Sequence, residues 1–231
     1  MPPKTRRTSK AAAKKRILIV DDHPMMRQGL SQLVKTENDL AVCGEAETSR
    51  EALDQAIRLK PDLVLIDITL PDKNGLELIK DIRAVLPETL LLVISMHDES
   101  MYAERVLRAG GRGYIMKQEG GKRLMEAIRQ VLSGQIYVSA KMSAKILEGL
   151  SGRKTAGGNS PVESLSDREF EVFQLIGQGA STRLIAEQLH LSTKTVEVHR
   201  VNIKQKLNLK TAPDLIRFAV RWIESEPSSK T

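Results

Sequence analysis

Residues 15–134 alternate between short apolar runs and longer amphipathic stretches, and this alternation constrains the fold more than any other feature of the chain. Parallel strands need crossover connections and are buried on both faces, so their sequences read as nearly continuous apolar runs. Each run is followed by a segment with apolar residues at helical spacing. The five runs are KRILIVDD, LAVCGEA, LVLID, LLLVIS and GYIMK. We therefore predict an α/β domain with a five-stranded parallel sheet and helices on both faces.

Polar side chains stand at the carboxyl ends of the predicted strands, where ligands bind in sheets of this kind. Clustered carboxylates raise one another's pKa unless a cation lies between them, and Mg²⁺ suits a site with few carboxylates plus carbonyl and water ligands. Any one of these residues could simply be a polar strand end. Together they favour a magnesium site. The residues are Asp21 and Asp22 after the first strand, Asp67 after the third, Ser95 at the end of the fourth and Lys117 after the fifth.

A carboxylate beside Mg²⁺ can attack a phosphoryl group and form an acyl phosphate. Here Asp67 would be that nucleophile, while the metal and Lys117 would neutralise the transferring oxygens. A phosphatase of the haloacid-dehalogenase type also uses an aspartate after a strand. That chemistry normally needs a second aspartate two positions later, where Thr69 stands, and the chain is short for a cap domain. No GxxxxGK[ST] nucleotide loop is present.

The pattern changes after residue 150. Residues 150–163 are rich in Gly, Ser, Lys and Pro without hydrophobic period, which is typical of a flexible linker. Residues 164–225 then read as helices, beginning with the capping box formed by Ser166 and Glu169. Two helices joined by a tight turn, TRLIAEQL and STKTVEVHRVNIKQKLN, indicate a helix-turn-helix unit. Apolar helices in a small bundle would give the same periodicity.

The second helix of this unit and its flanks carry five basic residues and one acid between positions 190 and 210. A solvated basic helix would also look like this, but the pattern suits a helix that lies in a DNA groove. Phosphate contacts would come from Lys194, Thr195, Arg200 and Lys204, with His199 as a partial candidate. Base edges or thymine methyl groups would be contacted by Glu197, Val198 and Val201.

Net charge is weak support for DNA binding by the folded parts. The chain has a net charge of +7, and residues 1–16 contain seven basic residues and no acid, so the rest is balanced. We expect this tail to be disordered, either a solvated extension or a weak phosphate-binding arm. No apolar stretch approaches the roughly 20 residues that cross a bilayer. We expect a cytoplasmic protein that does not bind membranes.

Residues 15 to about 133 resemble a response-regulator receiver domain through the motifs IVDDH, LIDITLPDKNG, VISMHD and GYIMK. This resemblance implies a flavodoxin-like fold in which Asp67 accepts phosphate from a sensor histidine kinase. It also implies that Asp21, Asp22, Asp67 and the backbone carbonyl of Thr69 hold Mg²⁺. Ser95 and Lys117 would contact the phosphoryl group, and Tyr114 would turn inward behind Ser95.

The segment from Leu165 to Leu209 resembles the LuxR-type output domain, and the two domains together resemble the NarL/FixJ family of transcription regulators. Relatives usually carry Glu where Leu184 stands, so the helix TRLIAEQL should lack a capping box. The expected division is a basic disordered tail (1–14), a receiver domain (15–135), a linker with a short helix (136–163), a helix-turn-helix domain (164–225) and a tail (226–231).

This resemblance implies a DNA-binding transcription regulator that phosphorylation of Asp67 switches, and that is a homodimer when phosphorylated or on double-stranded DNA. Self-directed phosphotransfer happens once per molecule, so we do not expect an enzyme. The alternative is a phosphorylation-independent DNA-binding regulator whose receiver serves only for dimerisation or docking.

Overall fold

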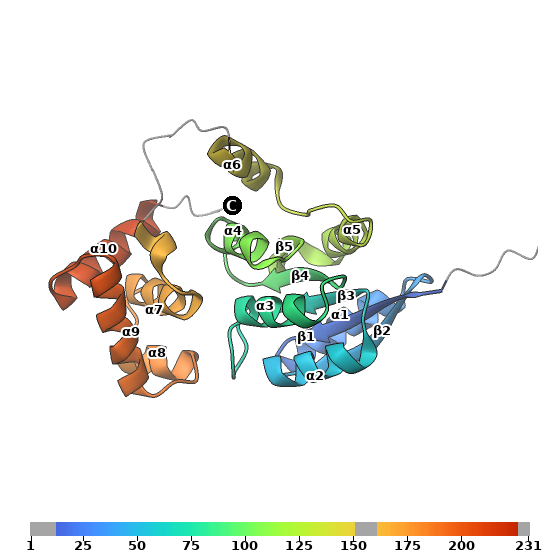
Figure 1. Ribbon diagram of the computed structural model, residues 1–231, viewed down its shortest axis with the longest axis horizontal. Helices are drawn as coiled ribbons and strands as arrows, with labels where there is room; N and C mark the ends of the chain where they lie inside the picture. The colour runs from blue at the N-terminus through green and yellow to red at the C-terminus, as the bar shows by residue number, and fades with distance from the viewer. Residues whose placement is uncertain (1–12, 151–160, 226–231) are drawn as a thin grey trace, which may run out of the picture.

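The computed structural model describes residues 13–150 and 161–225. The expected terminal tails and the central part of the linker, which fall on residues 1–12, 151–160 and 226–231, lie outside the described residues. Figure 1 shows a sheet covered by helices, followed in the chain by a smaller group of helices. The architecture is therefore the α/β domain and all-helical domain that the sequence predicts.

The five strands form one parallel sheet in the order β2-β1-β3-β4-β5. In this register Val20 lies opposite Ile66, so the next residues, Asp21 and Asp67, leave adjacent strands at the same edge of the sheet. The sheet thus brings together acids that are 46 positions apart in the sequence. The strands are β1 (Lys15–Val20), β2 (Leu40–Ala46), β3 (Leu63–Ile66), β4 (Leu90–Ser95) and β5 (Gly113–Met116).

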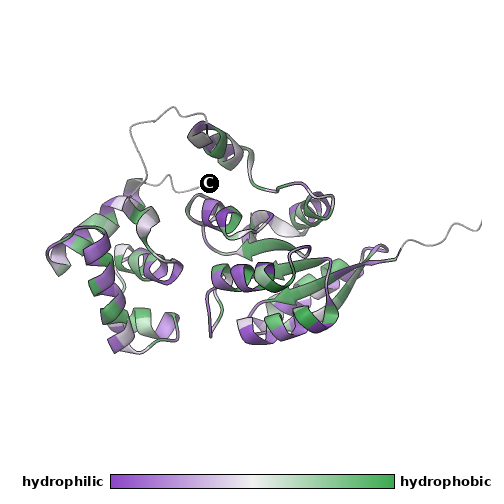
Figure 2. Ribbon diagram, in the orientation of Figure 1, coloured by the Kyte–Doolittle hydropathy of each residue, from purple (hydrophilic) through white to green (hydrophobic). Residues whose placement is uncertain are grey.

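Helices cover both faces of the sheet because alternate side chains of each strand point to opposite faces. Ile17 and Ile19 of β1 belong to one core cluster, with α1 (Pro24–Lys35) and α5 (Gly120–Leu132). Leu18 and Val20 belong to the other. That second cluster includes α2 (Ser49–Leu59), α3 (Gly75–Val85) and α4 (Glu99–Ala109). Figure 2 shows the strands as hydrophobic ribbons between helices that also carry hydrophilic residues.

The turn after β3 is held by side chains that the sequence provides for a helix start. Asn74 is the N-cap of α3, and its Oδ1 accepts a hydrogen bond from the backbone N of Leu76 at 2.6 Å. Gly75 follows because a Cβ at this position would overlap the backbone carbonyl oxygen of Asp67. This close approach fixes the loop that leaves Asp67 against the start of α3.

The first part of the predicted linker packs against the α/β domain. Tyr137 pairs with the edge strand: its carbonyl oxygen accepts from the backbone N of Tyr114 at 2.9 Å. The backbone N of Ser139 donates to Glu99 at 2.7 Å, and Met142 of α6 (Ala140–Leu150) is buried. A short helix thus lies in this part of the chain, and it packs on α4.

The C-terminal helices pack around aromatic side chains. Trp222 lies edge-on to Phe170 and Phe173, with ring centroids 5.5 and 5.6 Å apart. A short 3₁₀ turn, η2 (Pro161–Ser164), precedes this group, as another, η1 (Lys117–Glu119), follows β5. The helices are α7 (Asp167–Gly177), α8 (Thr182–Gln188), α9 (Thr193–Lys206) and α10 (Ala212–Ser225).

The helix caps of this domain follow the sequence pattern. The capping box of Ser166 and Glu169 opens α7. Ser192 caps α9 by accepting from the backbone N of Thr195 at 3.0 Å. Ser181 caps α8 without a reciprocal acid, as Leu184 at that position predicts. Across residues 13–150 and 161–225, no helix is long and apolar enough to span a bilayer.

Candidate functional site

Asp21, Asp67 and Lys117 meet at the carboxyl edge of the sheet. The ammonium nitrogen of Lys117 lies 2.6 Å from Asp21 Oδ2 and 2.7 Å from Asp67 Oδ2. All three side chains are buried, and Asp67 is only 3% exposed. One lysine thus pairs with two carboxylates that come from neighbouring strands. Because two negative groups share one positive group, this buried site has an excess of negative charge.

This imbalance shifts the pKa values of the cluster. Burial, with a smaller contribution from the Asp21 charge, raises the pKa of Asp67 to about 6, although Lys117 acts in the opposite direction. Burial also works against the charge of Lys117, but the carboxylates of Asp67 and Asp21 hold its pKa above the ordinary value. The ionised form of Asp67 therefore destabilises the folded protein unless a further cation is bound nearby.

The surroundings of Asp67 fit such a cation. Asp21, Asp22, His23 and Asp67 each offer a ligand atom, and these atoms lie within 4.8 Å of one another. Oδ1 of Asp22 is buried without a hydrogen bond, although Nδ1 of His23 lies 2.7 Å away. A bound cation would satisfy this oxygen, and the predominance of carboxylate oxygens suits a hard divalent ion. Sequence reasoning did not single out His23, although it follows directly on the acidic pair.

Ser95, His97 and Tyr114 form the wall beside the acids. Oγ of the buried Ser95 accepts from the backbone N of His97 at 3.2 Å. Tyr114 is also buried, and its hydroxyl donates to the backbone carbonyl of His97 at 2.7 Å. Nε2 of His97 lies 3.2 Å from Oγ1 of Thr69, so the loops after β3 and β4 touch. His97 was not predicted; its place two residues after Ser95, at a strand end, was the available signal.

Helix α9 presents an exposed surface opposite the side chains that it buries. Val196 and Ile203 are buried, whereas Lys194, Glu197, Val198 (53% exposed) and Val201 (45%) face outward. Thr195 and Lys204 are half-buried. Exposed apolar and acidic side chains thus lie beside the exposed Lys194 on this surface of α9.

Two residues of the expected DNA surface are less available. The side chain of Arg200 is only 16% exposed, because its guanidinium donates to Oγ1 of Thr182 on α8 at 2.8 Å. His199 is half-buried, and its Nδ1 is buried without a hydrogen bond. Burial lowers the pKa of His199, so this ring is a poor candidate for a phosphate contact. The helical pattern could not foresee that α8 captures Arg200.

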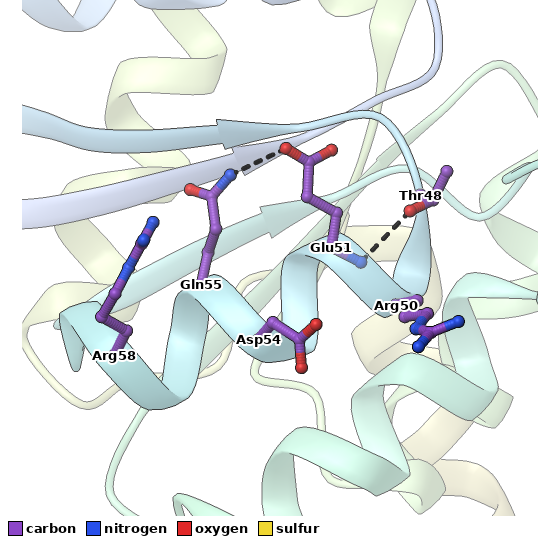
Figure 3. Close-up of a pocket in the computed structure, with 6 residues that line it drawn as sticks. All are labelled: Thr48, Arg50, Glu51, Asp54, Gln55 and Arg58. Atoms are coloured by element: carbon purple, nitrogen blue, oxygen red, sulfur yellow. Dashed lines mark hydrogen bonds between the residues drawn. The ribbon is translucent and has the colours of Figure 1, made fainter.

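A hollow on the outer side of α2 is unrelated to these residues. It is lined by charged and polar side chains of the helix, including Arg50 and Glu51 (Figure 3). Glu51 takes part in capping, since its backbone N donates to Oγ1 of Thr48 at 3.1 Å. The residues that line this hollow are not among those gathered around Asp67.

Family models match both parts of the chain. The model described as "Response regulator receiver domain" matches residues 17–129, and "Bacterial regulatory proteins, luxR family" matches residues 163–219. Among curated proteins, the oxygen regulatory protein NreC of Staphylococcus aureus (strain bovine RF122 / ET3-1) is 37% identical over 210 residues, which is 89% of this chain and 97% of that protein.

Solved structures are also similar. A LuxR-family two-component response regulator from Aurantimonas sp. SI85-9A1 is 32% identical with a TM-score of 0.56, covering 60% of this chain and 99% of that one. RcsB from Salmonella enterica serovar Typhimurium, bound to promoter rprA in the presence of phosphomimetic BeF3⁻, is 26% identical with a TM-score of 0.59 and covers 90% and 98%. With the acid cluster after a parallel sheet and the exposed helix α9, these similarities make the chain a member of the NarL/FixJ family of two-component, DNA-binding response regulators.

Proposed function

We propose that Asp67 is the residue that receives a phosphoryl group from a sensor histidine kinase, and that phosphorylation controls DNA binding by α9. The observation that carries this proposal is the shared contact of Lys117 with Asp21 and Asp67, at 2.6 and 2.7 Å. A carboxylate held on a strand end, beside a lysine and other acids, has the surroundings that phosphoryl transfer needs.

In the transfer step, a carboxylate oxygen of Asp67 forms a bond to phosphorus while the bond between phosphorus and the kinase histidine breaks. Lys117 would neutralise the phosphoryl oxygens as they develop charge. Asp21, Asp22 and Asp67, with the backbone carbonyl of Thr69, would hold Mg²⁺, and His23 lies within reach of the same position. When bound, Mg²⁺ would balance the excess negative charge and orient the phosphoryl group.

The switch would start at Ser95. A phosphoryl group on Asp67 adds roughly −1.5 to −2 charges and three strong acceptor oxygens. The hydroxyl of Ser95 can donate to one of these oxygens. Because Ser95 and Tyr114 both hydrogen-bond the backbone of His97, a movement of Ser95 would be passed to the loop that begins α4.

DNA would be read by α9. We expect Lys194, Thr195 and Lys204 to contact phosphates, with Arg200 after it leaves Thr182, and Glu197, Val198 and Val201 to contact base edges. A homodimer would place two α9 helices on half-sites related by two-fold symmetry. The structure of RcsB on promoter rprA supports this role by similarity.

The division of the chain and its location belong to the same proposal. We infer a receiver domain over residues 15–135, a linker over 136–163 and an output domain over 164–225, acting in the cytoplasm beside the kinase and the DNA. The extents of the two family matches, 17–129 and 163–219, support this division.

The experiment is a DNA-binding comparison. Duplexes selected from a random pool by the wild-type chain are titrated with wild type and Asp67→Asn, each before and after treatment with acetyl phosphate and Mg²⁺. We expect treatment to tighten binding by wild type only. Equal binding in all four samples would favour the phosphorylation-independent alternative, and turnover of a phosphomonoester by catalytic amounts of protein would indicate a phosphatase.

A further inference from the structure

The output domain is docked on the receiver through α7. The hydroxyl of Tyr102 on α4 donates to Oε1 of Gln174 at 2.6 Å, and both groups are buried. Asp167 at the start of α7 accepts from Lys80 of α3 at 2.9 Å and from Arg105 of α4 at 3.3 Å. The contact is thus specific and polar, with partners on two receiver helices.

Aromatic and buried polar contacts reinforce this docking. The Arg105 guanidinium lies 4.1 Å from the centre of the Phe170 ring, and the rings of Tyr102 and Phe170 meet edge to face at 5.4 Å. Nδ2 of Asn74 donates to Oε1 of Glu171 at 2.6 Å. Asn74 belongs to the turn that leaves Asp67, so α7 is tied directly to the phosphoacceptor loop.

A cavity lies between the docked domains, and Asp22 and His23, which lie beside Asp67, border it. Its volume is about 410 Å³. The receiver side is formed by residues that surround Asp67, namely Asp22, His23, Thr69 and His97. The opposite side is formed by α7 and by the turn between α8 and α9, including Gln174, Gln178, Gln188 and His190. The output domain therefore covers the side of the receiver from which a phosphodonor would approach Asp67.

From this arrangement we infer that the docked output domain is a gate that admits a small phosphodonor to Asp67 but excludes a protein carrying phosphohistidine. The inference rests on the proposed role of Asp67. A cavity of this volume lies in the range of small-molecule sites. A phosphohistidine on a kinase, by contrast, must bring the surrounding protein close to Asp67, into the space that α7 and the α8–α9 turn occupy. Undocking would then precede transfer from the kinase.

Docking leaves the DNA-reading side chains free. Val198 and Val201 of α9 remain exposed, because the contact uses α7. The docked arrangement therefore controls access to Asp67 without covering the reading face of α9. His97 lies between the loop that follows Asp67 and the docking contact on α4. Its Nε2 lies 3.2 Å from Oγ1 of Thr69, and its ring centroid lies 5.0 Å from that of Tyr102.

The test compares two phosphodonors on the full chain. One is acetyl phosphate; the other is an autophosphorylated sensor-kinase core, selected beforehand because it transfers measurably to the wild-type chain. The variants Gln174→Ala and Asp167→Asn each weaken docking from α7, outside the acid cluster. Glu187→Gln is the matched control, since Glu187 is exposed on α8 and pairs with Arg183 of the same helix. Circular dichroism verifies folding.

For both docking variants we expect the rate of transfer from the kinase core to rise roughly fivefold per lost contact, the factor for a hydrogen bond of ordinary net strength. The rate with acetyl phosphate should stay within about twofold, and Glu187→Gln should match wild type with both donors. Kinase rates that do not rise, or equal increases with both donors, would overturn the gate. Absence of any labelling at Asp67 by acetyl phosphate would instead contradict the proposed function.

Discussion

Replacing Asp67 with asparagine should stabilise the metal-free protein at alkaline pH. The pKa of Asp67 is raised from 3.8 to about 6, mainly by burial. A folded-state pKa above the unfolded value means that the ionised group destabilises the fold: the penalty is absent well below pH 3.8 and complete above about pH 6. A shift of this size corresponds to about 3 kcal/mol at pH 8 and about half of that at pH 5.

Calorimetry of wild type and Asp67→Asn in EDTA, at pH 8 and pH 5, measures this penalty. At pH 8 the receiver transition of Asp67→Asn should lie roughly 10 °C above that of wild type, given about 3 kcal/mol and a domain of this size. At pH 5 the gap should be about half as large. Saturating Mg²⁺ should reduce or reverse it, because the metal stabilises the ionised carboxylate and the variant loses a ligand.

Asp62 provides the control. It lies at the amino end of β3, and although partial burial opposes its charge, hydrogen bonds from the backbone N of Arg16 and from Lys15 lower its pKa. Asp62→Asn should therefore slightly destabilise the protein, with or without Mg²⁺. The electrostatic interpretation of the acid cluster would be refuted if Asp67→Asn were less stable than wild type in EDTA at pH 8, or if the gap were the same at both pH values.

The fold and most of the receiver site could be predicted because they depend on local pattern. Apolar runs of strand length, separated by amphipathic segments, leave few arrangements besides a parallel sheet, and the carboxyl ends of such strands meet at one edge. Asp21, Asp67 and Lys117 were therefore predictable as neighbours. The capping box of Ser166 and Glu169 marked a helix start for the same reason: its partners are three residues apart.

Contacts between distant segments could not be predicted in this way. Nothing in the helical period of α9 indicates that Arg200 turns to Thr182, or that Nδ1 of His199 is buried. The docking of α7 depends on Tyr102 and Gln174, which are 72 positions apart, and each looks like an ordinary helical residue in the sequence. Tertiary packing determines such pairings. Amphipathic periodicity indicates which side of a helix is buried, but it does not indicate which residue of another segment will contact that side.

Three further predictions follow from particular contacts. Lys194→Ala should weaken binding to all DNA sequences and reduce the slope of log affinity against log salt by about one, whereas Glu197→Ala should alter sequence preference. Titrations at several salt concentrations measure this slope, and an unchanged slope for Lys194→Ala would contradict the phosphate contact. Burial, opposed by Arg168 and Asn74, raises the pKa of Glu171 to about 7. The docked state should therefore be most stable below the ordinary carboxyl pKa and lose stability as pH rises through 7. Small-angle scattering should show expansion of the wild-type chain over that pH range and no expansion of Glu171→Gln. Gly75→Ala should destabilise the receiver by roughly 1–3 kcal/mol, because the new methyl group would overlap the Asp67 carbonyl oxygen, and an unchanged urea midpoint would show that the loop can move aside.

Mass spectrometry of the treated protein tests the role of Asp67 most directly. The full chain is incubated with acetyl phosphate and Mg²⁺, reduced with borohydride to trap any acyl phosphate, and digested. The modification should be found on Asp67 in wild type, and it should be lost when EDTA replaces Mg²⁺ or when Asp67 is asparagine. A modification on another carboxylate in wild type, or equal labelling of wild type and Asp67→Asn, would contradict the assignment of Asp67 as the phosphoacceptor.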